Sequence, residues 1–151
     1  MSQEYNTLNR LIHLSGRLLD QEDFKNYVAL FSEGGEYRLT ARAPEVAQPM
    51  TWILLKRDEM DALLASAPKQ EWNTGERCHL ITVEEINVDG AAAGSRASFC
   101  VFRTDLRGVT ETYAVGHYED QWQAESGQWR LLKRVARLQT RMLAPPSAIP
   151  I

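Results

Sequence analysis

The chain has 151 residues, of which 44% are hydrophobic and 25% charged, and its formal net charge is −3 at pH 7. This length and composition fit one domain, residues 1–151, with a core of ordinary size. The acidic balance argues against nucleic acid as a partner. No apolar run approaches the roughly 20 residues of a membrane span, and the N-terminus lacks the basic and apolar regions of a signal peptide, so we expect a soluble, cytoplasmic protein.

Three segments carry apolar residues at helical spacing. Residues 3–20 predict an amphipathic helix, and a short second helix is expected at 24–31, before a Gly-Gly pair that would end it. A third helix is expected at 56–67 and should end at Pro68, because proline disrupts a helix interior.

Strand patterns account for most of the remaining chain. Residues 36–41 predict a short strand, and the apolar run at 51–55 fits either a strand or a buried loop. Runs at 77–88 and 97–104 and a long hairpin at 113–142 predict four antiparallel strands. Helices followed by such a meander indicate an α+β fold, a cone-shaped, curved antiparallel or mixed sheet covered on one face by the N-terminal helices.

The second arm of the hairpin, residues 129–142, contains no proline or glycine and is expected to be a central strand. Both of its faces mix apolar and basic residues, whereas a strand with one buried face should alternate cleanly. Two explanations stay open. A partner subunit that accepts guanidinium groups would bury the second face, or a β-bulge would shift the alternation midway.

Basic residues gather at the C-terminal end, since residues 1–122 carry a net charge of −7 and residues 123–151 one of +4. The long cations of the last strand need carboxylates, either from neighbouring strands or from a second copy. The available carboxylates are Asp105, Glu111, Glu119 and Asp120.

Residues 144–151 predict an extended C-terminal tail, because Pro145 and Pro146 forbid a helix or central strand. The tail is either frayed or lies on a neighbouring subunit. We favour a homotrimer. Its expected interface residues are Arg130, Arg134, Arg137, Arg141, Leu143, Ile149 and Ile151.

Other polar residues have both structural and catalytic readings. A cone-fold enzyme would use an Asp or His as general acid or base with help from tyrosine hydroxyls. The candidates are His79, His117 and Tyr37, with Tyr113, Tyr118, Asp20 and Asp23 as further possibilities. The histidines are more simply hydrogen-bonded structural residues, and the two aspartates helix caps. Cys78 and Cys100 are expected to be buried free thiols.

Two stretches carry a family resemblance. Residues 18–37 resemble the helix-to-strand passage of the nuclear transport factor 2-like cone fold, which ketosteroid isomerase shares. Residues 116–122 (GHYEDQW) and 127–143 (GQWRLLKRVARLQTRML) resemble the closing hairpin of the small β subunit of Rieske-type aromatic-ring-hydroxylating dioxygenases. The order and spacing of these pieces agree over nearly the full length.

This resemblance implies an accessory chain. In that family a large α subunit carries the Rieske [2Fe–2S] cluster, a mononuclear iron and the substrate pocket, while β subunits form a trimeric base within an α3β3 assembly. The sequence has no Cys-x-His pair and no two-His-one-carboxylate spacing, with His13, His79 and His117 as its only histidines. We therefore expect no catalytic, cofactor or metal site in this chain. The alternatives are a stand-alone isomerase or dehydratase and a small-molecule-binding protein.

Overall fold

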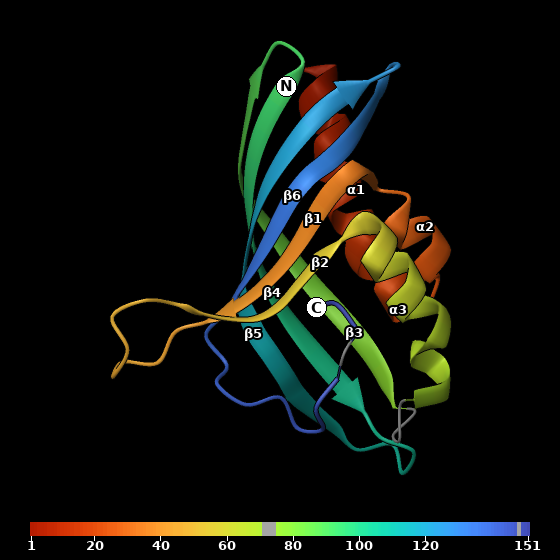
Figure 1. The fold of residues 1–151 in the computed structure, drawn as a ribbon, viewed down its shortest axis with the longest axis vertical. Coiled ribbons are helices and arrows are strands. Elements are labelled where there is room, and N and C mark those ends of the chain that lie inside the picture. The colour runs from red at the N-terminus through yellow and green to blue at the C-terminus, as the bar shows by residue number, and fades with distance from the viewer. Residues whose placement is uncertain (71–74, 148) are drawn as a thin grey trace.

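Three helices and one six-stranded sheet form the part of the chain that the computed structural model describes, residues 1–70, 75–147 and 149–151 (Figure 1). The helices are α1 (Gln3–Asp20), α2 (Phe24–Val28) and α3 (Arg57–Gln70). The strands are β1 (Phe31–Ala41), β2 (Met50–Lys56), β3 (Glu76–Asp89), β4 (Ala92–Thr104), β5 (Thr110–Glu125) and β6 (Gln128–Leu138). The helices lie on one side of the curved, open sheet, which confirms the predicted α+β cone.

The sheet is mixed, with the strand order β2-β1-β6-β5-β4-β3. Strands β3 to β6 form the predicted antiparallel meander. β1 pairs antiparallel with β2 and parallel with β6. The last long strand is therefore central, as its lack of proline and glycine predicts, and the apolar run at 51–55 is a strand rather than a loop.

The boundary between the second helix and the first strand was predicted wrongly. α2 ends at Val28, and Phe31 is the first residue of β1, opposite Leu131. The pairing of β1 with β6 shifts register between Phe31 and Glu36, and Gly34 has φ of +75° within that shift. The Gly-Gly pair thus forms an irregularity inside a strand and not a helix end.

The third helix also runs past its predicted end. α3 continues to Gln70, two residues beyond Pro68. A proline removes one backbone donor, and near a helix terminus that loss does not require the last turn to unwind.

A β-bulge in β6 explains the mixed faces of this strand. Gln121 pairs with Lys133 and Trp122 with Leu131, so Leu132 is an extra residue between them. Leu131 points into the core before the bulge, and Arg134 does so after it. The bulge shifts the alternation from odd to even positions, which confirms the second of the two explanations.

Helix α1 closes one side of the cone with the apolar stripe that its spacing predicts. Its buried residues are Leu8, Ile12, Ser15, Gly16, Leu18 and Leu19. A Cβ at Gly16 would lie 2.7 Å from Ile81 Cδ1 and 2.9 Å from His79 Cβ. The absence of a side chain at this position lets α1 rest closely on β3.

Candidate functional site

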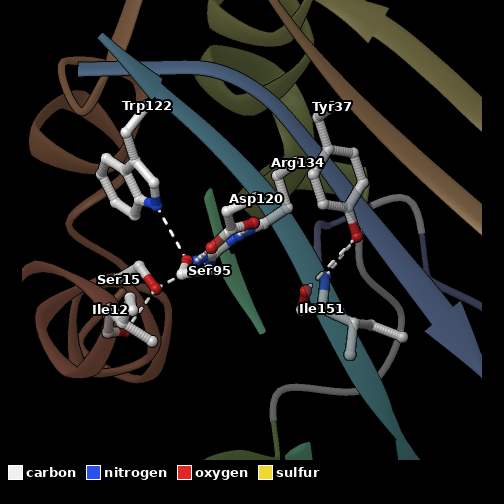
Figure 2. Close-up of polar contacts among 8 residues, drawn as sticks. All are labelled: Ile12, Ser15, Tyr37, Ser95, Asp120, Trp122, Arg134 and Ile151. Atoms are coloured by element: carbon white, nitrogen blue, oxygen red, sulfur yellow. Dashed lines mark hydrogen bonds and ion pairs between the residues drawn. The ribbon is translucent and has the colours of Figure 1, made fainter. Parts of the chain in front are cut away.

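An ion pair between Arg134 and Asp120 lies at the centre of the cone (Figure 2). Arg134 Nε and Nη2 donate to the two Asp120 oxygens at 2.9 and 2.8 Å, the bidentate geometry that a guanidinium and a carboxylate favour. Arg134 Nη1 donates to Ser15 Oγ on α1, which in turn donates to the Ile12 carbonyl. This chain of bonds ties the central strands of the sheet to the helix that covers them.

Aromatic residues enclose the ion pair. The Arg134 guanidinium carbon lies 4.1 Å from the centre of the Tyr118 ring, which stacks on Phe99. Arg134 is 0% exposed and Asp120 4% exposed. Burial by itself would lower the pKa of Arg134, but the Asp120 carboxylate outweighs burial and raises that pKa. The arginine is therefore permanently charged inside the core.

Three buried tyrosines should resist ionisation. Burial raises the pKa of Tyr27 to about 12 and also raises those of Tyr37 and Tyr118. An unfolded tyrosine ionises near pH 10, so the stability gained from neutral Tyr27 is present below that pH and is lost as the pH rises through about 12. We expect absorbance at 295 nm to show a group of tyrosines that ionises only as the fold is lost. Early ionisation of all five tyrosines in the folded protein would contradict this.

The C-terminal tail folds back into its own chain. Ile149 and Ile151 are buried, the latter completely. Tyr37 Oη accepts from the Ile151 amide at 2.9 Å (Figure 2), and Tyr113 Oη donates to the Pro145 carbonyl at 2.6 Å. Both isoleucines are expected from the sequence at a subunit interface, but they lie in the core, because the open end of the cone offers an apolar surface within the same chain.

His79 and Asp20 form a second polar contact, between β3 and α1, in which the imidazole is buried and the carboxylate partly exposed. His79 Nδ1 lies 2.5 Å from one Asp20 oxygen, and the His79 backbone N–H donates to the other at 2.8 Å. Asp20 is therefore bound to a strand and is not a helix cap, whereas Asp23 does cap α2 by accepting from the Asn26 amide. The imidazole is 0% exposed, and Gly16 packs against it. The Nδ1 side of the ring ties β3 to α1, while Nε2 is buried without a hydrogen-bond partner among the described residues.

His117 belongs to a charged ladder on the sheet face that the helices leave open. Glu84, Arg96, Glu119 and Arg137 follow one another on β3, β4, β5 and β6, with nitrogen–oxygen distances of 2.8, 3.6 and 2.9 Å between successive members. His117 Nε2 lies 3.4 Å from Glu119 Oε1. Partial burial acts to raise the pKa of Glu119, but Arg137 and His117 outweigh it and hold that pKa below its usual value.

The three residues suggested for a stand-alone enzyme do not meet in one site. Tyr37 is on β1 and His79 on β3, with three strands between them in the sheet. His117 belongs to the charged ladder on the open face, opposite to its buried neighbour Tyr118. No group of three His, Cys, Asp or Glu that could hold a metal occurs among the described residues.

The remaining interface candidates lie in several environments. Arg130 donates to the Ala29 carbonyl, Arg137 pairs with Glu119, and Arg141 is exposed. Arg134 is inside the core, so it is not available to a partner. The carboxylates of Asp120 and Glu119 come from the same chain, the first of the two sources that the sequence leaves open.

The cysteines and Leu143 are less buried than the core. Cys78 is exposed and Cys100 half-buried, so the prediction of buried thiols was wrong for Cys78. Its strand alternates, and the even positions of β3 face away from α1. Leu143 is partly buried and packs against the core.

Residues 2–135 match the family model of the SnoaL-like domain. The chain belongs to the SnoaL-like domain family. None of the described helices has the length and apolar character needed to cross a membrane.

Similar SnoaL-like chains include β subunits of oxygenases. The chain is 27% identical to the 2-aminobenzenesulfonate 2,3-dioxygenase subunit beta of an Alcaligenes species, over 96% of this chain and 97% of that one. It is 28% identical to the methanesulfonate monooxygenase hydroxylase subunit beta of Methylosulfonomonas methylovora, over 89% and 80%. A crystal structure described as the beta subunit of an aromatic-ring-hydroxylating dioxygenase of Novosphingobium aromaticivorans superposes with a TM-score of 0.83 at 23% identity, over 97% and 95%. The resemblance to such β subunits is confirmed.

Proposed function

We propose that this SnoaL-like chain is the non-catalytic, structural β subunit of an aromatic-ring-hydroxylating oxygenase and acts in the breakdown of aromatic compounds. Its similarity to oxygenase β subunits covers nearly the whole chain. The observation that carries the proposal is the filled interior of the cone. Arg134, Tyr118 and Ile151 all have exposures of 0%, so side chains of the protein itself fill the centre of the molecule.

The catalytic alternative has less support from the geometry. A general base must reach a substrate proton directly or through one water. His79 is bound to Asp20 and covered by α1, and the nearby cavity of about 310 Å³ is lined by Asp20 but not by the imidazole. The pair therefore serves best as a link between α1 and β3.

The proposal assigns the chemistry to a partner. A large α subunit would hold the Rieske [2Fe–2S] cluster, the mononuclear iron and the substrate, and this chain would support it in a cytoplasmic α3β3 assembly. Cofactor-binding residues are not assigned to this chain.

Co-purification tests this function. The chain is expressed alone and together with a large subunit from the same organism that carries a Cys-x-His Rieske motif. We expect the two to purify as one complex that contains the iron, and the isolated chain to hold no stoichiometric iron and to turn over no arene. One tightly held iron per isolated chain, or failure of the two subunits to associate, would overturn the proposal.

The open face of the sheet supports self-association. It carries the charged ladder and, at its edges, exposed apolar residues such as Trp52 on β2 and Leu80 on β3, which are 38% and 56% exposed. Apolar side chains beside paired charges are typical of protein interfaces. We propose that this face contributes to a homotrimer.

Light scattering on the isolated chain should report this trimer at micromolar concentration. Arg137→Glu is expected to weaken the trimer, because the substitution puts a second carboxylate next to that of Glu119 on the proposed interface. Arg107→Glu, in the loop after β4, is the control and should leave assembly unchanged. Deletion after Leu143 is not a clean test, since it removes Ile149 and Ile151 from the core. A wild-type monomer would exclude the trimer.

A further inference from the structure

A cavity of about 310 Å³ is lined by the C-terminal tail, the end of α1 and the adjoining ends of β3, β4 and β5. These strand ends lie at the lower end of the sheet in Figure 1. Its walls combine apolar side chains, Phe24 and Ile149 among them, with the guanidinium groups of Arg77 and Arg103. This size is at the lower end of the range for small-molecule sites.

The two arginines are direct cross-strand neighbours. Arg77 on β3 pairs with Arg103 on β4, and both side chains line the cavity. Like charges placed opposite one another on adjacent strands destabilise a sheet unless a counter-charge lies between them. The arrangement therefore favours an anion in the cavity.

Neither guanidinium forms an ion pair with a carboxylate of the described residues. Arg103 Nη2 is inaccessible to solvent and has no hydrogen-bond partner among the described residues. Arg77 lies 4.9 Å from the centre of the Tyr113 ring, and its Nη1 is 3.5 Å from the Pro150 carbonyl. Arg103 Nη2 is covered by the protein, so a ligand in the cavity would meet the other atoms of the Arg103 guanidinium together with those of Arg77.

The guanidinium of Arg103 lies close to the backbone at Gly75. A Cβ at Gly75 would lie 2.8 Å from Arg103 Nη2 and 2.7 Å from the Thr104 carbonyl oxygen. The Thr104 carbonyl is backbone and cannot easily move, so glycine suits this position.

Three carboxylates also line the cavity, those of Asp20, Glu22 and Glu76, and none of them forms an ion pair with Arg77 or Arg103. Asp20 uses both oxygens on His79. Glu22 and Glu76 line the cavity but are exposed at its rim. Glu111, opposite Arg103 on β5, is exposed and does not line the cavity.

We propose that this cavity binds a small organic oxyanion, a carboxylate or sulfonate carried on a single ring or short apolar chain. Arg77 and Arg103 would receive the oxyanion, because guanidinium groups match the planar or tetrahedral oxygens of such anions. The apolar side chains would receive the remainder of the ligand. The site is independent of the proposed subunit role, since all its residues come from this chain.

Titration of the full chain with benzoate, followed by amide chemical shifts, tests the site. Saturable shifts are expected at Gly75, Arg77 and Arg103. Benzamide, which has the same shape without the charge, should bind at least tenfold more weakly. Arg103→Gln should weaken benzoate binding at least tenfold, and Arg77→Gln similarly, whereas Arg107→Gln, in the following loop, should leave it unchanged.

The outcomes separate clearly. Competition between sulfate and benzoate would support recognition of the oxyanion group. Equal binding of benzamide, unchanged binding in a folded Arg103→Gln protein, or no saturable shift would overturn the proposal. If Arg103→Gln does not fold, Arg77→Gln decides alone. None of these results depends on association with an α subunit or on trimer formation.

Discussion

Replacement of Asp120 by alanine is expected to lower the free energy of unfolding by about 3–5 kcal/mol, because it leaves the Arg134 guanidinium charged and unpaired inside the core. Arg134 is completely buried, and the Ser15 hydroxyl that also accepts from it is neutral. A neutral hydroxyl cannot replace the carboxylate. Urea denaturation followed by circular dichroism measures the change.

Glu119→Ala is the matched control. Glu119 is next to Asp120 on the same strand and forms an ion pair with Arg137. Both side chains of that pair are more than one third exposed, so the expected loss of unfolding free energy is about 1 kcal/mol or less. A second test replaces the whole pair, as Asp120→Leu with Arg134→Met, and should recover much of the stability that the single substitution removes. Equal losses for Asp120→Ala and Glu119→Ala would show that the buried charge has little energetic weight.

Phe31→Ala should cost about 3–5 kcal/mol as the truncation of a buried aromatic side chain. Phe31 is 0% exposed, and its ring meets the Tyr27 ring edge-on at a centroid distance of 5.7 Å. The residue joins the first strand to α2, so the cavity left behind has walls on both elements. Thermal and urea unfolding measure the loss.

Phe102→Ala makes the same chemical change at a half-buried position on β4 and should cost clearly less. A Phe31→Ala protein that unfolds at the same temperature as the wild type would show that the core around α2 is not closely packed.

The sequence predicted an element correctly where its local pattern is compatible with only one type of secondary structure. The uninterrupted run after Trp129 indicated a central strand, and the structure confirms it. The Gly34-Gly35 pair has two readings, because glycine suits both a helix end and a strand irregularity, and the pairing with β6 decided between them. Long-range contacts of this kind are not encoded in neighbouring residues.

The candidate sites depended even more on tertiary contacts. The need of the C-terminal arginines for carboxylates follows from charge alone, and Asp120 was among the candidates, but only the bulge at Leu132 turns Arg134 toward it. No pattern within residues 144–151 indicates whether the tail packs on its own core or on another subunit. The pairing of Arg77 with Arg103 follows from the register of a long hairpin, which the sequence predicts only to within a few residues.

The parallel pairing of β1 with β6 has a consequence for how the chain folds during synthesis. β1 and the helices before it leave the ribosome early, but the strand that completes their side of the sheet is the last one made. Protein synthesis adds about 5–20 residues per second, so β1 is without its neighbour β6 for several seconds. The meander from β3 to β5 can form meanwhile from contacts close in sequence, whereas the sheet must await the release of the final strand before β1 can join it.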